Sequence, residues 1–228
     1  MGLIGLLWDV DGTLSNSYDL GYTCTNIVLQ NHGQNPINEQ EYHEGTRYPT
    51  PQRFAWHVTK NPDDSIGEVL GKEFDDLYIK LVSKKTAGLY EGIYDMLLHL
   101  KQKNSKVKYG ALSNACVAYV EAVLRENDLD RDFDVVLGAD NVPRPKPAPD
   151  GLLQCCASLQ LLPANCVYIG DSPTDGLAAR AANMKSIVVT WGSHSLEKIT
   201  PAFDQIVHSV EELRRVLVSL IDPKNEES

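Results

Sequence analysis

The chain has 228 residues, of which 43% are hydrophobic and 23% charged, a composition typical of a folded globular protein and not of a disordered one. It carries 31 acidic and 21 basic residues, and the net charge of -10 argues against a general affinity for nucleic acid or for an anionic membrane. A small anionic substrate stays compatible with this charge, because a bound cation and a few basic side chains set the field inside a site.

The sequence predicts a cytoplasmic protein. No stretch is apolar over a length that spans a bilayer, and the N-terminus lacks the basic start and the small-residue cleavage pattern of a signal peptide. The five cysteines are an odd number without the CxxC pairs of a zinc site, so we expect reduced thiols in a reducing compartment.

The first element is a short apolar run, residues 3–8, which ends in two acids, Asp9 and Asp11. Its length and its abrupt polar end predict a buried strand of a parallel sheet. Two carboxylates this close repel each other unless a cation, a proton or a reacting group separates their roles, and a divalent metal is the simplest remedy. Mg²⁺ shares its oxygen shell with substrate phosphate, while Gly12 lets the backbone approach a ligand and Thr13 offers a hydroxyl and an N–H. The pattern indicates phosphoryl chemistry, although an acidic turn that caps a helix or faces solvent is the simpler alternative.

A helical segment follows this strand. After a polar break, residues 18–87 have helical patterns and no convincing strand. Within them, residues 66–82 carry one apolar stripe, which we interpret as a face packed in a core. We therefore expect an all-helical domain, residues 17–87, inserted between two parts of another domain.

The chain beyond residue 88 alternates between helix and strand, which is typical of a parallel sheet covered by helices on both faces. Together with the first strand, this part predicts an α/β, Rossmann-like sheet domain made of residues 1–16 and 88–228. Such a sheet binds its ligand beyond the carboxyl ends of its strands. The predicted helices are residues 93–103, 117–126, 151–159, 174–182 and 210–220, and the predicted strands are residues 107–112, 133–137, 166–169, 186–190 and 205–207.

Polar side chains follow three further strands. Ser113 and Asn114 stand where a helix begins, which makes an anion site of a hydroxyl, an amide and free helix N–H groups unless the two residues simply cap the helix. A proline-rich loop holds Lys146, whose ammonium group would offset phosphate charge, with an ordinary surface lysine as the alternative. Asp171 and Asp175 follow the fourth strand, where acids in a first helical turn often only cap the helix.

The run Asp9-Val-Asp11-Gly12-Thr13 resembles the first motif of the haloacid dehalogenase superfamily, in its phosphatase branch. In that family the first acid is a nucleophile that forms an aspartyl-phosphate, and the second is the general acid and base. The resemblance therefore implies that Asp9 attacks a phosphate monoester and that Asp11 protonates the leaving oxygen and later deprotonates water. A protonatable second acid also favours phosphate chemistry over carbon–halogen chemistry.

The later motifs of the family are matched in the right order. Ser113 resembles the second, Lys146 in Lys-Pro-Ala-Pro-Asp the third, and Asp171 with Asp175 in Gly-Asp-x-x-x-Asp the fourth. The resemblance implies a helical cap domain at residues 17–87 and a Mg²⁺ cofactor, with metal ligands at Asp9, Asp11 through its carbonyl, and Asp171, and with Asp175 supporting metal-bound water or the lysine. It implies a phosphate-binding set of Gly12, Thr13, Ser113, Asn114 and Lys146.

The substrate's leaving group would be recognised mainly by the cap. Arg47, Arg53 and His57 are candidates for contacts to an anionic or polar group, although surface residues of a helical domain need no such role. The whole pattern resembles phosphoglycolate phosphatases, so we expect a small soluble phosphate monoester, phosphoglycolate-like or a sugar phosphate. A phosphomutase similar to beta-phosphoglucomutase and a non-catalytic phosphometabolite-binding protein stay open as alternatives, and the sequence does not predict an oligomeric state.

Overall fold

The computed structural model describes residues 4–199 and 202–222 of the chain. Within these residues, six parallel strands form one sheet in the order β3-β2-β1-β4-β5-β6. The first strand of the chain is thus central, with β2 and β4 as its neighbours, and the order reverses beside it. The strands are β1 (Gly5–Trp8), β2 (Lys108–Leu112), β3 (Val135–Leu137), β4 (Cys166–Gly170), β5 (Lys185–Val189) and β6 (Gln205–Val207).

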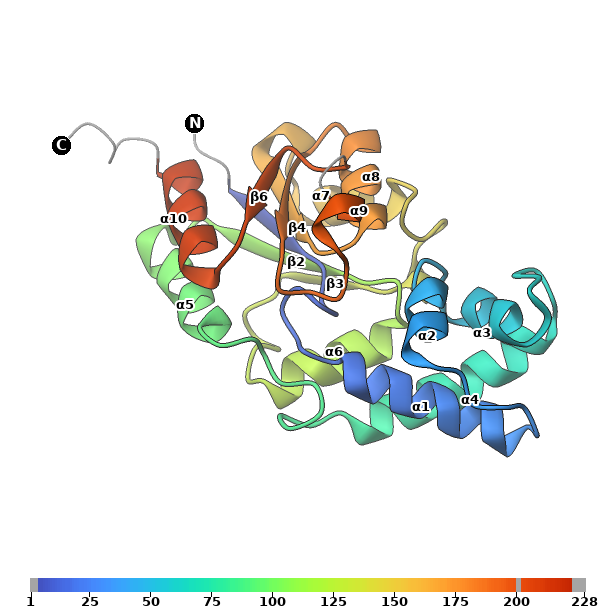
Figure 1. Cartoon of the computed structure of the whole chain (residues 1–228). Helices are drawn as coiled ribbons and strands as arrows, with labels where there is room; N and C mark the ends of the chain where they lie inside the picture. The colour runs from blue at the N-terminus through green and yellow to red at the C-terminus, as the bar shows by residue number, and fades with distance from the viewer. Residues whose placement is uncertain (1–3, 200–201, 223–228) are drawn as a thin grey trace.

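Helices cover both faces of this sheet (Figure 1). Alternate side chains of a strand point to opposite faces, so Leu6 and Trp8 join one buried apolar cluster and Leu7 joins the other. Burial on both faces explains why β1 is apolar throughout and lacks the alternation of a half-exposed strand. The first cluster includes residues of α5 (Ile93–Lys103), α6 (Val117–Glu126) and α10 (Val210–Ile221), and the second includes residues of α7 (Asp150–Leu159) and α8 (Pro173–Ala181).

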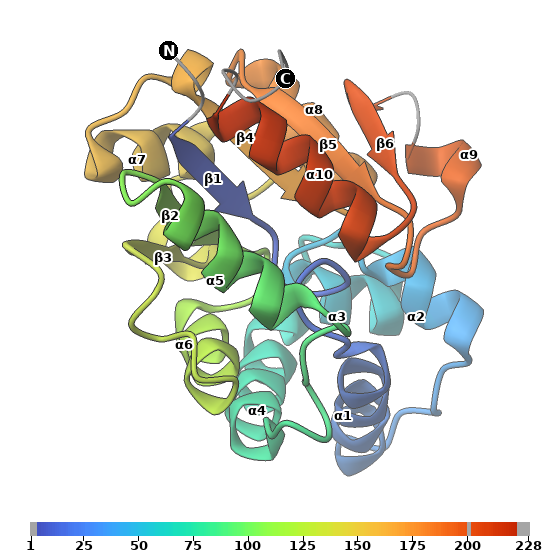
Figure 2. The same ribbon diagram turned by 90° about the vertical axis from the view of Figure 1, so that its left-hand side faces the viewer.

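Four helices between β1 and α5 form a separate group, which we call the helical insertion (residues 17–87). Figure 2 shows them together below the sheet, on the side toward which the arrowhead of β1 is directed, with α4 beside α6. The carboxyl ends of the strands therefore face the insertion. Its helices are α1 (Tyr18–Asn31), α2 (Glu39–Gly45), α3 (Thr50–Thr59) and α4 (Ile66–Leu81).

The two chain segments that lead into and out of the insertion run side by side. Ser15 forms isolated bridges with Asp11 and with Leu89, and its hydroxyl donates to the carbonyl of Ala87 at 2.9 Å. The N–H of Asn16 adds a bond to the carbonyl of Gly88 at 2.8 Å. These bonds hold the insertion close to the turn that carries the first acids.

The predicted fold class is confirmed: the described residues form a parallel α/β sheet flanked by helices, with an all-helical insertion. The helices predicted at residues 93–103 and 117–126 have the predicted bounds. Strand β3 begins at Val135 instead of residue 133. Just before it, the carboxylate of Asp134 accepts the N–H of Tyr109 at 2.8 Å. The short helix α9 (Leu196–Ile199) was not predicted. No described helix combines the length and hydropathy that a membrane span requires.

Candidate active site

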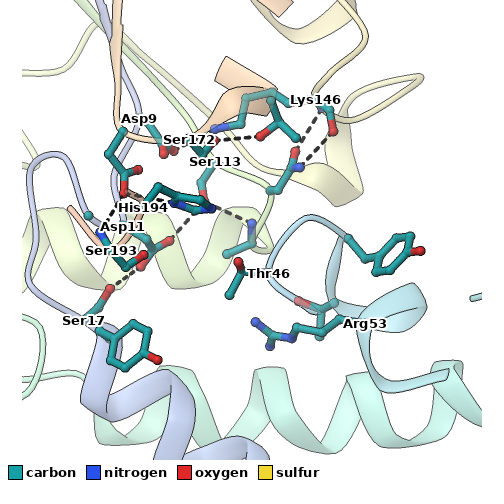
Figure 3. Close-up of a pocket in the computed structure, with 18 of the residues that line it drawn as sticks. Asp9, Asp11, Ser17, Thr46, Arg53, Ser113, Lys146, Ser172, Ser193 and His194 are labelled. Carbon is teal, nitrogen blue, oxygen red and sulfur yellow. Dashed lines mark hydrogen bonds and ion pairs between the residues drawn. The ribbon is translucent and has the colours of Figure 1, made fainter. Parts of the chain in front are cut away.

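The side chains predicted at the strand ends meet in one pocket at the carboxyl edge of the sheet (Figure 3). Asp9 follows β1, Ser113 follows β2 and Asp171 follows β4, and all three line the pocket. Lys146, from the loop between β3 and α7, lines it as well. Because parallel strands end at the same edge, residues far apart in the chain become neighbours here.

Lys146 is buried between two acids. Its Nζ donates to Oδ1 of Asp9 at 2.8 Å and of Asp175 at 2.6 Å, and to the hydroxyl of Tyr168 at 3.0 Å. The side-chain amide of Asn114 holds the lysine's main chain, with bonds to its N–H and its carbonyl that are both 2.9 Å long. Burial would lower the pKa of Lys146, but the carboxylates of Asp175 and Asp9 outweigh burial and raise it. The ammonium group therefore stays charged beside Asp9.

Three buried acids cluster at this site, and two of them contact the ammonium group. Asp9, Asp171 and Asp175 each offer a carboxylate oxygen within 4.8 Å of the others. Burial, and next the repulsion from Asp175, raise the pKa of Asp9 well above its usual range, and burial also raises the pKa of Asp171. For Asp175, Lys146 outweighs burial and the pKa is lowered. The cluster has more acids than the one lysine neutralises, and a divalent cation would offset the excess negative charge.

The residues around Asp171 fit a hard divalent cation. Asp9 and Asp171 supply carboxylate oxygens, the ligand type that Mg²⁺ prefers. Two glycines let the backbone pass close beside them: a Cβ at Gly12 would lie 2.3 Å, and one at Gly192 2.1 Å, from Oδ2 of Asp171. Gly12 also has a φ of +75°, a conformation that residues with a side chain rarely adopt. A larger residue at either position would fill the space beside the carboxylate.

Asp175 holds the lysine and the start of α8. Its Oδ1 accepts hydrogen bonds from Lys146 and, at 3.1 Å, from Tyr168. Its Oδ2 accepts the N–H of Ser172 at 2.9 Å and the hydroxyl of the same residue at 2.7 Å. Both oxygens are engaged, which favours support of the lysine among the roles that the motif implied for Asp175.

The carboxylate of Asp11 lies in the same pocket but apart from the three clustered acids. Its Oδ1 accepts hydroxyl groups of Ser17 at 2.5 Å, Tyr119 at 2.6 Å and Tyr78 at 3.2 Å. Its Oδ2 accepts the hydroxyl of Ser113 at 3.2 Å. The two acids of the first motif thus have different surroundings: Asp9 faces a lysine, and Asp11 faces four hydroxyls.

The helical insertion forms the opposite wall of the pocket. The guanidinium of Arg53 lies 4.5 Å from the ring centroid of Phe74 and 5.7 Å from that of Tyr42. The side chain is 9% exposed, and its Nε and Nη2 have no hydrogen-bond partner among the described residues. The residues of the insertion that line the pocket are Ser17, Tyr18, Tyr42, Thr46, Tyr48, Thr50, Arg53, Phe74 and Tyr78.

The insertion also contacts the sheet domain across the pocket. The Nε2 of His43, on α2, lies 2.8 Å from the carbonyl of Ser193, in the loop after β5. The rings of His43 and His194 are 4.7 Å apart, and Nδ1 of His194 lies 3.7 Å from Oδ2 of Asp171. The pocket is therefore enclosed between the sheet edge and the docked insertion.

The sequence model of one protein family, described as haloacid dehalogenase-like hydrolase, matches residues 6–189. This range covers most of the chain and contains all the acids and the lysine of the pocket. The chain belongs to this family.

Curated relatives of this hydrolase include several phosphatases. The phosphoglycolate phosphatase of Nitrosococcus oceani is 26% identical over 217 residues, which cover 93% of this chain and 95% of the relative. The phosphoglycolate phosphatase of Xanthomonas campestris pv. campestris is 30% identical over 191 residues, or 82% of this chain and 83% of the relative. The N-acetylmuramic acid 6-phosphate phosphatase of Pseudomonas aeruginosa is 27% identical over 196 residues, or 84% of each. These relatives confirm the resemblance to the phosphatase branch and the prediction that the chain is an enzyme of that kind.

Solved structures agree with this family. A Bacteroides fragilis protein described as a haloacid dehalogenase-like hydrolase superposes with a TM-score of 0.82 at 26% identity, over 92% of this chain and 99% of that one. The structure of CbbY from Rhodobacter sphaeroides in complex with phosphate superposes with a TM-score of 0.80 at 22% identity, over 92% and 96% of the two chains, and supports the fold alone.

Not every residue that the motifs singled out lies in the pocket of this hydrolase. Gly12, Ser113 and Asn114 line it, whereas Thr13 is fully buried and its hydroxyl has no hydrogen-bond partner among the described residues. Arg47 does not line the pocket either. Its guanidinium lies over the rings of Tyr48, at 4.9 Å, and Trp56, at 5.4 Å.

Several side chains at the site of this hydrolase do not follow from the sequence patterns, among them Tyr78, Tyr119 and His194. Tyr78 belongs to the apolar stripe that was assigned to a core, and Tyr119 follows the same helical pattern in α6. His194 lies in a polar loop with no motif around it. Its position after β5 was the one available signal, because every strand end of a parallel sheet lies at the ligand-binding edge.

Proposed function

We propose that this enzyme hydrolyses a small, soluble phosphate monoester through an aspartyl-phosphate on Asp9, with Mg²⁺ as cofactor. The observation that carries the proposal is the ion pair between Nζ of Lys146 and Oδ1 of Asp9, 2.8 Å long, inside a pocket that also holds the carboxylate of Asp11. A bound divalent cation would offset the repulsion from Asp175 and Asp171 that raises the pKa of Asp9. The carboxylate oxygen of Asp9, beside a fixed ammonium group, is then suited to attack a phosphoryl group, because the ammonium offsets the charge of both.

In the first half of the reaction, an oxygen of Asp9 attacks phosphorus and the ester P–O bond breaks. Asp11 gives its proton to the leaving oxygen, which departs as an alcohol. Ser113 and Asn114, which line the pocket at the end of β2, would lie beside the phosphoryl oxygens, and the hydroxyl of Ser113 would donate to one of them.

In the second half, the oxygen of a water molecule attacks the same phosphorus and the bond to Asp9 breaks. Asp11, now ionised, takes the proton of the water, and inorganic phosphate leaves. One ester and one water give one alcohol and one phosphate, and both acids return to their starting states.

The proposed ligands of Mg²⁺ are Asp9, Asp171 and the main-chain carbonyl of Asp11. The charge excess of the acid cluster and the glycine-lined space beside Asp171 support this assignment. When bound, the ion would supply positive charge against the negative substrate phosphate.

The pocket also supports a small leaving group with an anionic or polar end. Arg53 is its buried cation on the insertion side, and the aromatic rings around it leave its Nε and Nη2 without protein acceptors among the described residues. Relatives named as phosphoglycolate phosphatases support a compact organic phosphate as substrate.

The test is a screen of the purified chain with Mg²⁺ against a panel of phosphorylated metabolites, which includes phosphoglycolate, sugar phosphates and p-nitrophenyl phosphate. We expect phosphate release from one or a few esters, and none by Asp9→Asn. No release from any ester would overturn the proposal. Activity that needs a sugar bisphosphate and gives no net phosphate would identify a phosphomutase instead.

A further inference from the structure

Two stacked tyrosines cross the boundary between the helical insertion and the sheet domain. Tyr78 comes from α4 of the insertion and Tyr119 from α6 of the sheet domain, and their ring centroids are 3.9 Å apart with planes inclined by 9°. Tyr119 is fully buried and Tyr78 is 5% exposed. Burial, and next the charge of Asp11, raise the pKa of both phenols, so both remain hydrogen-bond donors in the working pH range.

Both phenols donate to the same oxygen atom. The hydroxyl of Tyr119 lies 2.6 Å, and that of Tyr78 3.2 Å, from Oδ1 of Asp11, and the hydroxyl of Ser17 completes the set at 2.5 Å. Any rotation of the Asp11 side chain would break several of these bonds at once. The other oxygen, Oδ2, is held apart from the phenols and lies 3.2 Å from the hydroxyl of Ser113 at the end of β2.

This arrangement separates the two oxygens of one carboxylate. Oδ1 is anchored by three hydroxyl groups, and Oδ2 lies on the side where Ser113 would hold the phosphoryl group. A general acid must have one oxygen within hydrogen-bond distance of the atom that takes its proton, and misplacement by a fraction of an ångström lowers the rate. An anchored Oδ1 fixes where Oδ2 can be.

We propose that Tyr119 and Tyr78 are positioning residues for Asp11, which hold Oδ1 so that Oδ2 exchanges the proton with the leaving group, and that the hold is complete only while the insertion is docked. The inference rests on the proposed function. Tyr119 reaches Asp11 from the sheet domain, whereas Tyr78 reaches it from the insertion and stacks on Tyr119. By contrast, the ion pair of Asp9 with Lys146 involves the sheet domain alone. The hold on Oδ1 of Asp11 therefore draws on both parts of the chain, whereas the ion pair of Asp9 does not.

Substitution of each tyrosine by phenylalanine tests this, because the ring and the stack remain while one hydroxyl is removed. The measurement is kcat/KM, which reports formation of the aspartyl-phosphate, for the best alkyl phosphate found in the screen and for p-nitrophenyl phosphate, whose leaving group needs little protonation. For Tyr119→Phe we expect a loss of about tenfold with the alkyl ester, the scale of one hydrogen bond to a charged group, and less than about twofold with the aryl ester. Tyr78→Phe, with the longer bond, should show the same selectivity with a smaller loss.

Matched controls remove a phenol hydroxyl that does not reach Asp11. Tyr109→Phe in the sheet domain removes a bond to the carbonyl of Leu97, and Tyr22→Phe in the insertion removes one to the carbonyl of Ile37. Neither should change the ratio of the two kcat/KM values, whatever it does to thermal stability.

The reference variant is Asp11→Asn, which should lose far more activity with the alkyl ester than with the aryl ester. If Asp11→Asn shows no such difference, the acid role in the proposed function is wrong. The other outcome is that Asp11→Asn loses more activity with the alkyl ester while both tyrosine variants leave the ratio of the two kcat/KM values unchanged. In that case the positioning role is wrong and the proposed function stands. Should Tyr119→Phe fail to fold, Tyr78→Phe carries the same decision.

Discussion

The sheet edge and the helical insertion both contain buried charged groups, but only the sheet edge pairs them within the protein. Lys146, Asp9 and Asp175 are each nearly inaccessible, and the lysine bridges both acids at hydrogen-bond distance. A buried charge without a partner costs several kcal/mol, so the mutual pairing explains how this cluster can stay folded before a substrate arrives.

Several buried polar atoms of the insertion lack such partners. Nε and Nη2 of Arg53, both ring nitrogens of His57 and Oδ1 of Asp75 have no hydrogen-bond partner among the described residues. Burial, and next the charges of Arg53 and Lys60, lower the pKa of His57 to about 3, so this ring is neutral and does not act as a cation at neutral pH. Arg53 is then the charged group of the insertion that faces the pocket.

This difference in pairing suggests that the sheet edge and the insertion have different roles in the reaction. Under the proposed function, the paired groups at the sheet edge would serve a step common to all phosphate esters, and the unpaired guanidinium of Arg53 across the pocket would gain a partner when an anionic leaving group binds. Relatives in the family are named for different phosphate substrates, among them phosphoglycolate and N-acetylmuramic acid 6-phosphate. Substitutions at the sheet edge should therefore lower kcat/KM by the same factor for all substrates. Substitutions in the insertion should lower it by different factors for different substrates.

Metal removal should have the largest effect, because it acts on the charge excess of the sheet edge. Exhaustive chelation should abolish phosphate release from every substrate, and Mg²⁺ should restore it. Ca²⁺ should inhibit, because its larger and more flexible shell relaxes the attack geometry. Phosphate release is measured before and after chelation, and activity that survives exhaustive chelation would be incompatible with the proposed site.

Loss of the buried ammonium group should come next. Lys146→Met keeps most of the side-chain length but removes the charge, so kcat/KM should fall by about 100-fold or more. The factor should be the same for the natural substrate and for p-nitrophenyl phosphate. Lys108→Met is the matched control, since Lys108 lies at the start of β2 and donates to the carbonyl of Leu159 at 2.7 Å, away from the pocket. Unequal losses for the two substrates at Lys146 would contradict a role in the common step.

Arg53→Met should lower kcat/KM for the natural substrate far more than for p-nitrophenyl phosphate. We expect kcat/KM to fall by about tenfold for the natural ester, the scale of one charge-assisted contact, and to change little for p-nitrophenyl phosphate. The same substitution at Arg47, which packs on Tyr48 and Trp56 outside the pocket, should change neither value by more than about twofold. Equal losses for both substrates in Arg53→Met, at unchanged thermal stability, would show that the insertion serves the chemistry and not the choice of substrate.

Asp75 of the insertion should affect stability and not activity. Burial, and less so Asp140, raise its pKa to about 6 against the opposing charge of Arg53. An acid whose pKa is raised by folding binds more protons in the folded than in the unfolded state between about pH 4 and pH 6, so the free energy of unfolding falls as the pH rises through that window.

In Asp75→Asn that fall should be smaller, by on the order of 1 kcal/mol, because the amide does not ionise. Thermal unfolding of both proteins across the window measures the difference. Parallel curves for the two proteins would mean that Asp75 is solvated in solution and carries no raised pKa.

The fold and the positions of the candidate catalytic residues at the sheet edge could be predicted because local patterns determine them. A fully apolar run such as residues 5–8 requires burial on both faces, and the acids that follow it must then lie at the sheet's carboxyl edge. The same argument applied to Ser113 and Asp171, and the structure brings both into the pocket with Asp9.

The insertion wall could not be predicted, because it depends on how two helical groups pack. Tyr78 and Tyr119 have the spacing of core residues, and nothing in that spacing distinguishes a ring buried in a core from one whose hydroxyl reaches an acid. Arg47 and Arg53 lie on either side of one proline-rich turn, yet one packs on outer aromatic rings and the other lines the pocket. Only the three-dimensional path of α3 separates them.

The central claim is that Asp9 carries the phosphoryl group, and direct detection of that bond tests it best. The purified chain is mixed with its best substrate and Mg²⁺, quenched in acid within one turnover, digested and examined by mass spectrometry. The peptide that contains Asp9 should gain the mass of one phosphoryl group, and the same peptide of Asp9→Asn should not. Rapid turnover with an unmodified Asp9 peptide at every quench time, or undiminished turnover by Asp9→Asn, would contradict the account.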